Sequence, residues 1–181
     1  MSRPAPDQPR PQSPQVAGKS IALDVGLSRI GVATCDPLRL SVRPLLTLTR
    51  ASRRQDFARL AALVTEQEAV AVICGLPLNM DGSDSDQTRS VRKWAMRLAH
   101  ALRALLGRPF PIIFWDERLS TYAAQQLLEG DEPRRGESSG EDAVAAAVIL
   151  RSYLDSQNTG DRVDFGRIDL PPKTDTETPA Q

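Results

Sequence analysis

The stretch Ile21-Ala-Leu-Asp-Val-Gly-Leu-Ser-Arg-Ile-Gly-Val-Ala-Thr-Cys35 decides the fold class. Its first five residues are a short apolar run, typical of a strand that is covered on both faces. A Gly-Leu-Ser turn leads into residues 30–35, where larger and smaller side chains alternate as in a second strand. Residues 45–49 form a third apolar run after Pro37. We therefore predict an antiparallel meander of three strands with short connections.

Downstream of this meander the sequence alternates between helical and strand patterns. Phe57, Leu60, Ala61 and Val64 have helical spacing, and the apolar runs 69–74 and 111–115 indicate two more strands. Further helices are expected at about 88–106, 121–128 and 142–154. This order predicts an α/β fold: a five-stranded mixed sheet, an antiparallel meander plus parallel strands, with helices on both faces.

The two ends of the chain differ in composition from the middle. Residues 1–19 and 157–181 are rich in Pro, Gln, Ser, Thr and Asp, so we predict disordered tails around one domain at 20–156. The chain has 23 Lys+Arg against 23 Asp+Glu, and the tails carry net charges of +2 and −2, so the domain is neutral too. Any binding to nucleic acid must therefore come from local patches.

Several classes of protein are excluded by simple features. No apolar run approaches the ~20 residues of a membrane span, and the N-terminus has no apolar signal segment. Cys35 and Cys74 lie far apart in apolar stretches, which favours buried thiols in a reducing cytoplasm over a disulfide. The single histidine, His100, argues against a His-rich metal site. We expect a cytoplasmic protein, not bound to a membrane, whose chemistry depends on carboxylates.

Acidic residues occur at three notable positions. Asp24 lies inside the most apolar strand, where an unpaired carboxylate costs several kcal/mol, unless it accepts hydrogen bonds from the following turn. Asp116 and Glu117 follow the fifth strand, at the kind of edge where α/β sheets bind ligands, although they also suit the dipole of a following helix. Asp142 opens the last helix, where its spacing from Ser139 equally fits a capping box.

Together these acids predict a metal site. A carboxylate in the first strand, one at a later strand end and one at the start of the final helix could converge at one edge of the sheet. Oxygen ligands without His or Cys select Mg²⁺ or Mn²⁺. One or two such ions activate water and stabilise the leaving oxygen in phosphodiester hydrolysis.

The helix at about 88–106 is amphipathic in an unusual way. One side is apolar, and the other carries Arg89, Arg92, Lys93, Arg97, His100 and Arg103, with no acidic residue between Arg89 and Arg108. A solvated face usually mixes signs, because like charges lose i,i+4 support. We therefore expect this face to bind phosphates, with His100 solvated. The preceding loop, 81–86, lacks a calcium-loop pattern and is expected to be a flexible turn, with Ser85 or Asp86 capping the helix.

Five stretches then carry a family resemblance. They are Leu23-Asp-Val-Gly-Leu-Ser-Arg-Ile-Gly-Val-Ala33, Gly75-Leu-Pro-Leu-Asn-Met-Asp-Gly82, Val91-Arg-Lys-Trp-Ala95, Asp116-Glu-Arg-Leu-Ser-Thr121 and Asp142-Ala-Val-Ala-Ala-Ala147. In this order and at these spacings they resemble the motifs of the YqgF-type nucleases, also called Holliday-junction-resolvase-like proteins or pre-16S rRNA nucleases. The resemblance covers residues 21–154.

The resemblance implies a ribonuclease-H-like fold and a metal-dependent endonuclease of the bacterial cytoplasm, acting on precursor rRNA or branched DNA. It implies that Asp24, Glu117 and Asp142 are catalytic and hold Mg²⁺ or Mn²⁺, with Asp116 the alternative to Glu117 and Glu141 to Asp142. It also implies that Arg29 and Arg118 lie near the phosphates, beside the basic helix that carries Arg89, Arg92, Lys93 and Arg97.

Other functions are compatible with the same residues. One is a non-catalytic nucleic-acid-binding protein of the same fold, acting in transcription or ribosome assembly. Another is a phosphotransferase of the actin-like ATPase type, which would need a far longer chain. Junction resolution would require a homodimer with two symmetric sites, although no stretch of the sequence marks an interface.

Overall fold

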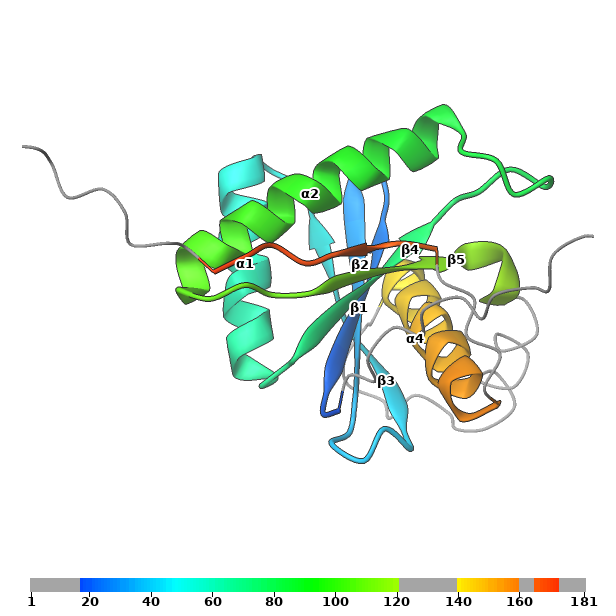
Figure 1. Ribbon diagram of the computed structural model, residues 1–181, viewed down its shortest axis with the longest axis horizontal. Helices are drawn as coiled ribbons and strands as arrows, with labels where there is room; N and C mark the ends of the chain where they lie inside the picture. The colour runs from blue at the N-terminus through cyan, green and yellow to red at the C-terminus, as the bar shows by residue number, and fades with distance from the viewer. Residues whose placement is uncertain (1–16, 121–139, 160–164, 173–181) are drawn as a thin grey trace, which may run out of the picture.

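The structure is a computed structural model that describes residues 17–120, 140–159 and 165–172 (Figure 1). The helix expected at 121–128 and most of the expected tails lie outside these ranges. Among the described helices, none is long and apolar enough to span a membrane.

The centre of the fold is one mixed sheet with strand order β3-β2-β1-β4-β5-β6. Its strands are β1 (Ser20–Val25), β2 (Arg29–Cys35), β3 (Val42–Thr49), β4 (Ala71–Leu76), β5 (Ile112–Asp116) and β6 (Arg167–Ile168). β1, β2 and β3 form the predicted antiparallel meander, and β1, β4 and β5 run parallel to one another. The carboxyl ends of β1, β4 and β5 therefore meet at one edge of the sheet, which we call the carboxyl edge.

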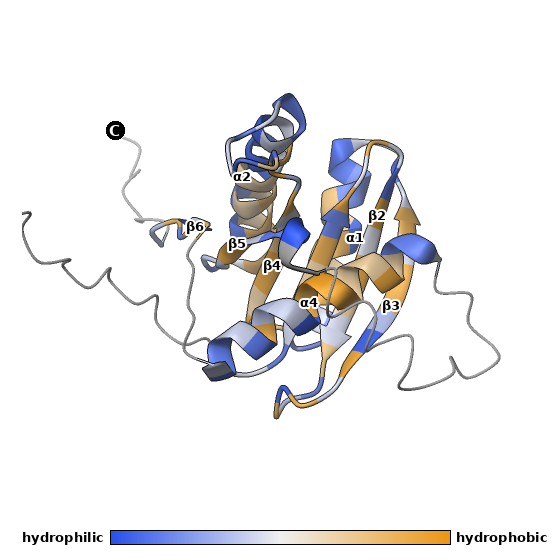
Figure 2. Ribbon diagram, turned by 90° about the vertical axis from the view of Figure 1, so that its right-hand side faces the viewer, coloured by the Kyte–Doolittle hydropathy of each residue, from blue (hydrophilic) through white to orange (hydrophobic). Residues whose placement is uncertain are grey.

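Helices cover both faces of the sheet, as predicted. The helices α1 (Arg53–Glu66) and α2 (Asp86–Leu106) pack on one face, and α4 (Glu141–Thr159) packs on the other (Figures 1 and 2). Ser85, one of the two candidates from the sequence, is the N-cap of α2, and Gly107 ends this helix in the left-handed conformation that glycine favours.

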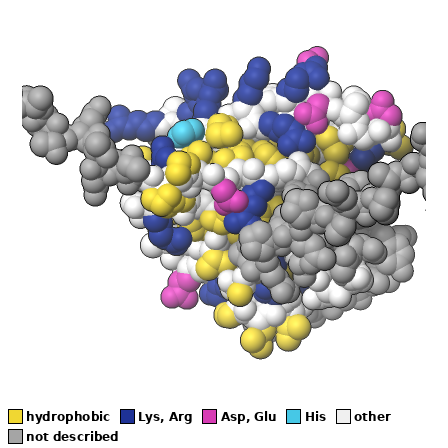
Figure 3. Space-filling model, in the orientation of Figure 1, with side chains coloured by type: hydrophobic (Ala, Val, Ile, Leu, Met, Phe, Trp, Pro, Cys, Tyr) yellow, Lys and Arg dark blue, Asp and Glu magenta, His cyan; other side chains and the backbone are white. Residues whose placement is uncertain are grey.

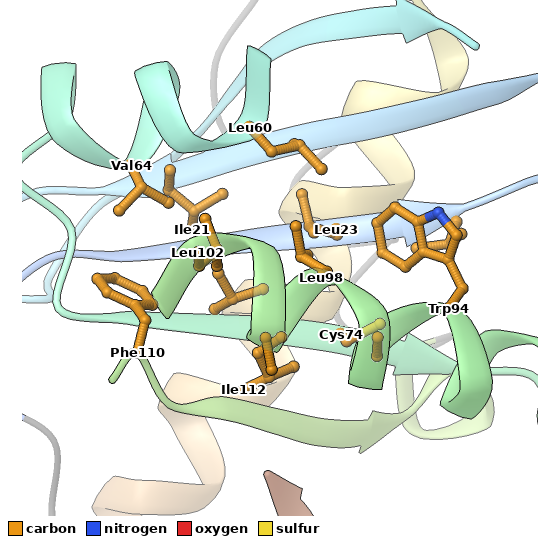
Figure 4. Packing of buried hydrophobic residues seen from close by; sticks show 14 of the residues in the cluster. Ile21, Leu23, Leu60, Val64, Cys74, Trp94, Leu98, Leu102, Phe110 and Ile112 are labelled. Carbon is orange, nitrogen blue, oxygen red and sulfur yellow. The ribbon is translucent and has the colours of Figure 1, made fainter. Parts of the chain in front are cut away.

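The main core lies between the sheet and the α1/α2 layer. Figure 4 shows Ile21 and Leu23 of β1 facing Leu60 of α1 and Leu98 of α2. A smaller core beneath α4 contains Ala22 and Ile73 from the alternate positions of β1 and β4. This alternation assigns every strand position to one of the two faces and so fixes the direction of the acidic side chains at the strand ends. Both cysteines are free and buried, as expected.

The sheet has six strands, not the five expected from the sequence. The sixth, β6, lies within the range 157–181 that was predicted to be a tail, and α4 also extends into that range, to Thr159. Ile168 of β6 is buried, and the backbone N–H of Phe114 donates to the carbonyl of Gly166 at 2.9 Å. The folded part of the chain thus continues beyond residue 156. β6 was missed because two residues are too few to show a strand period.

Candidate active site

Asp24 lies near the carboxyl end of β1 and faces the α4 side of the sheet. Its neighbours Leu23 and Val25 belong to the core under α1 and α2, so alternation turns Asp24 to the opposite face. The side chain is partly buried. Burial raises the pKa of Asp24, and the nearby charge of Asp142 raises it further. The ionised form of Asp24 is therefore short of compensating positive charge.

Asp142 lies near Asp24 because the N-terminus of α4 approaches β2 very closely. Gly31, which pairs with Asp24 across the strands, has no side chain there. A Cβ at Gly31 would lie 1.8 Å from the carbonyl oxygen of Asp142. The Asp142 carboxylate pairs with Arg29, whose Nε lies 2.8 Å from Oδ2. Glu141, the alternative to Asp142, is exposed.

Glu117, which directly follows β5, is the third of the predicted metal-binding acids. It begins the short 3-10 helix η1 (Glu117–Ser120), and it lies on the α4 side of the sheet, because its side chain and that of Ile149 of α4 both border Gly75. Burial raises the pKa of Glu117 to about 7, with contributions from the charges of Asp24 and Asp116. A second glycine makes room here, because a Cβ at Gly75 would lie 2.7 Å from Oε1 of Glu117.

Asp116 has a different environment from its neighbour. Ile112 and Phe114 belong to the core under α2, so alternation sends Asp116 to that face, where it is almost fully buried. It pairs with Arg118, whose Nη2 lies 2.6 Å from Oδ2. Glu117, not Asp116, therefore shares the α4 face with Asp24.

Gly31 and Gly75 are the site residues that sequence reasoning missed. A glycine inside a strand weakens it and often marks a close approach of another segment. Gly31 stands in a predicted strand and Gly75 directly follows the predicted strand 69–74, so the signal was present at Gly31 alone. What the sequence did not show is that the approaching groups are the start of α4 and the side chain of Glu117.

The donor set at the carboxyl edge fits a hard divalent cation. Asp24, Glu117 and Asp142 offer carboxylate oxygens only, the ligands that Mg²⁺ and Mn²⁺ prefer. Burial and the neighbouring carboxylates raise the pKa of Asp24 and of Glu117, so a bound cation would stabilise their ionised forms. Within the described ranges, however, no three His, Cys, Asp or Glu side chains are grouped tightly enough to hold a metal ion. Arg29 is the cation that Asp142 meets in this arrangement.

The basic face of α2 is divided between two roles. Figure 3 shows Lys and Arg side chains along the upper edge of the molecule, over α2. Lys93 and Arg97 are exposed and form no ion pair with any residue that the structure describes. Arg89 is exposed too, and it contacts Asp86.

Arg92 and Arg103, by contrast, hold the C-terminal segment. Arg92 pairs with Asp84 and donates to the carbonyl of Phe165 at 3.1 Å, and its guanidinium lies over the ring of Phe114. Arg103 donates to the carbonyl of Pro171 at 3.1 Å. The donors of Arg92 that a phosphate would need are thus engaged within the protein. The sequence did not show this because the segment they bind was read as a tail.

Comparisons with known proteins show the family of this chain. A family profile described as "RuvX: Holliday junction resolvase" matches residues 18–156. A protein of Cereibacter sphaeroides named "Putative pre-16S rRNA nuclease" is 44% identical over 140 residues, which are 77% of this chain and 84% of that protein. A protein of the same name from Myxococcus xanthus is 40% identical over 79% of this chain and 91% of its own length.

A solved structure shows the same fold. It is described as "T. thermophilus RuvC in complex with Holliday junction substrate" and matches with a TM-score of 0.56 at 13% identity, covering 79% of this chain and 96% of that one. The predicted ribonuclease-H-like fold and the resemblance seen in the sequence motifs are both confirmed.

Proposed function

Because the chain belongs to the RuvX family of Holliday junction resolvases, we propose that it is a metal-dependent endonuclease that hydrolyses phosphodiester bonds in structured nucleic acid. The observation that supports this proposal is that Asp24 lies near enough to Asp142 and to Glu117 for their charges to interact, and that burial and these charges raise the pKa of Asp24 and of Glu117. Carboxylates that lack compensating charge at a strand edge are suited to hold a cation.

In this mechanism Asp24, Glu117 and Asp142 hold Mg²⁺ or Mn²⁺. When bound, such an ion supplies the Lewis acidity that activates water and stabilises charge on the leaving oxygen. Arg29 orients Asp142 through their ion pair, and its side chain, 61% exposed, is accessible to a phosphate at the same edge. Gly31 and Gly75 leave the space that α4 and Glu117 need to reach Asp24.

Lys93, Arg97 and Arg89 on α2 bind the backbone of the substrate in this proposal. They are exposed and lie on the helix that starts at the carboxyl edge, after β4. Because the chain as a whole is neutral, the binding comes from this local patch and depends on salt.

We propose two candidate substrates, precursor 16S rRNA and branched DNA. The names of the relatives refer to the first, and the description of the family refers to the second. Processing of precursor rRNA would take place in the cytoplasm. Paired cleavage of a four-way junction would require a homodimer, because the two cuts need symmetric sites.

The alternative is a non-catalytic nucleic-acid-binding protein of the same fold. One observation favours it: Arg29 already pairs with the Asp142 carboxylate that would otherwise be available to a cation. In that case Asp24 and Glu117 would be remnants of a site and would hold no metal.

The test is cleavage of precursor 16S rRNA and of a four-way DNA junction side by side, with Mg²⁺, Mn²⁺ or EDTA. The wild-type protein should cut at least one substrate in a divalent ion and neither in EDTA. Asp24→Asn should abolish cutting while binding is retained. Asp155→Asn, an exposed acid in the last turns of α4, is the matched control and should cut like wild type. Salt-dependent binding without cutting under any metal would establish the alternative.

A further inference from the structure

Arg118 is the most heavily bonded arginine near the candidate active site. Its Nε lies 3.0 Å from both carboxylate oxygens of Asp116, and Nη2 donates to Oδ2 at 2.6 Å. Its Nη1 donates to the carbonyls of Asn79 and Met80, at 2.6 and 2.8 Å. All three guanidinium nitrogens thus donate within the protein. A phosphate would have to compete with a buried carboxylate and two carbonyls for these donors.

The carbonyls that Arg118 binds belong to the loop between β4 and α2, residues 77–85. The sequence predicted a turn at residues 81–86, and several hydrogen bonds connect this loop in the structure. Asn79 N donates to the Ser83 carbonyl at 3.0 Å, and Asn79 Nδ2 donates to the hydroxyl of Ser83 at 2.9 Å. At the far end Thr88 in the first turn of α2 donates to the carbonyl of Pro77. The loop therefore links the carboxyl edge to the start of α2 through defined contacts.

The contacts of Arg118 also constrain Glu117, because Arg118 is the next residue in the chain. Glu117 lies between the two members of the Asp116–Arg118 pair. The backbone N–H of Arg118 also donates to Oδ1 of Asp116 at 2.9 Å, which closes a tight turn around Glu117. Asp116 and Glu117 face opposite sides of the sheet. The pair on one side therefore fixes the backbone from which Glu117 reaches the other.

We propose that Arg118 is a positioning residue, which with Asp116 sets the orientation of Glu117 and joins the carboxyl edge to the loop that begins α2. The proposal rests on the proposed function for its catalytic consequence. It assigns Arg118 a role other than the phosphate contact that the family resemblance implied. The carboxylates and the basic face of α2 then keep one relative position, which cleavage at a defined phosphate requires.

Arg118→Lys separates the two roles. Lysine keeps the positive charge and still serves a phosphate as a point charge, but it cannot bind a carboxylate in bidentate fashion and reach two carbonyls as well. For a positioning residue, Arg118→Lys and Arg118→Ala should both lower kcat roughly tenfold or more, as loss of supporting contacts does in metal sites. KM and the salt dependence of binding should stay near wild type. Arg59→Ala, an exposed arginine on α1, is the matched control.

The opposite pattern would overturn the proposal. If Arg118→Lys cuts like wild type while Arg118→Ala binds more weakly, with a salt slope reduced by about one, Arg118 contacts phosphate. Asp116→Asn gives an independent check on the same pair. Its effect on kcat should not add to that of Arg118→Ala in the double variant, because both remove one interaction. Additive losses would contradict the pairing.

A second readout does not depend on activity. Amide hydrogen exchange at residues 79–83 should be slow in the wild-type protein and faster in both Arg118 variants, with Arg59→Ala unchanged. Unchanged exchange in both Arg118 variants would refute the coupling between the loop and the strand end. If the wild-type protein cuts nothing, the proposed function fails, and the exchange experiment still decides whether Arg118 joins these two segments.

Discussion

Two glycines leave space beside the acidic residues, and a side chain would be tolerated least at Gly31. A methyl group at Gly31 would meet the backbone of Asp142 at 1.8 Å, and backbone cannot rotate away as a side chain can. The start of α4 would have to move, and Asp142 would move with it. The closeness of Asp24 and Asp142 therefore depends on a residue that carries no functional group.

We expect Gly31→Ala to lower the free energy of unfolding by about 1–3 kcal/mol, as overpacking does, and to lower cleavage further than this loss explains. The measurements are chemical denaturation and single-turnover cleavage under conditions where the variant is folded. Gly107→Ala is the control, because Gly107 has φ of +70° but open space around it. It should lose about 1 kcal/mol from backbone strain and keep its activity. Full activity in folded Gly31→Ala would contradict the role assigned to this glycine.

Glu117 should make the stability of the metal-free protein depend on pH. Its pKa is raised from 4.5 to about 7, so the folded state binds more protons than the unfolded state between these values. The stabilisation is complete below the unfolded pKa and is lost as the pH rises through the folded one. We expect stability to fall across this window by up to about 3 kcal/mol, less after solvent screening.

Thermal unfolding of the metal-free protein between about pH 5 and pH 8 checks this expectation. Glu117→Gln should show a weaker pH dependence than wild type, whereas Glu66→Gln, at an exposed position on α1, should not. Mn²⁺ should restore stability to the wild-type protein at high pH, because it binds the ionised carboxylates of the folded state. Identical pH profiles for wild type and Glu117→Gln would rule out this account of Glu117.

At the scale of the element, α2 combines two functions on one basic face. Lys93 and Arg97 face solvent, whereas Arg92 bonds to Asp84 and to the carbonyl of Phe165. The first two should bind phosphates and the third should hold the structure together. A helical wheel cannot separate these roles, because all three residues lie on the same side.

Substitution by glutamine separates them experimentally. Lys93→Gln and Arg97→Gln should each reduce the slope of log affinity against log salt by about 0.7–0.9, with little change in stability. Arg92→Gln should leave the slope nearly unchanged and lower the melting temperature. The measurement is nucleic-acid binding at several salt concentrations together with thermal unfolding. A slope change for Arg92→Gln equal to that for Lys93→Gln would contradict the division.

The sequence predicted most of the helices and strands, but it did not predict how the acidic residues are arranged. Clear hydrophobic periods mark β1 to β5, α1 and α2, and a capping signal marks the start of α2 near Ser85. Their positions were therefore predicted within a few residues. The sequence did not show which of Asp116 and Glu117 faces Asp24. That choice depends on where α4 packs, and the packing of α4 depends on Gly31, a contact between segments more than a hundred residues apart.

At the scale of the whole molecule, the C-terminal segment completes the sheet. β6 pairs with β5, Ile168 is buried, and two arginines of α2 bind carbonyls of Phe165 and Pro171. Without β6 the backbone of β5 would form an open sheet edge, which favours aggregation. A segment that reads as a tail in composition thus protects the strand that leads to Glu117.

Truncation tests this role of the segment. Removal of residues 160–181 should lower the melting temperature by about 5 °C or more, from the loss of buried apolar surface, and should increase aggregation. Removal of residues 173–181 leaves every described contact in place and should change neither. Differential scanning calorimetry with light scattering measures both effects. Equal stability of the two truncated proteins would show that β6 contributes nothing to the fold.

The central claim is that Asp24, Glu117 and Asp142 together hold a divalent cation. The most direct measurement is calorimetric titration of the protein with Mn²⁺ in the absence of nucleic acid. Wild type and Asp155→Asn should bind Mn²⁺ with the same affinity, and Asp24→Asn and Glu117→Gln should each bind at least about tenfold more weakly. Equal Mn²⁺ affinity for wild type, Asp24→Asn and Glu117→Gln would contradict the claim.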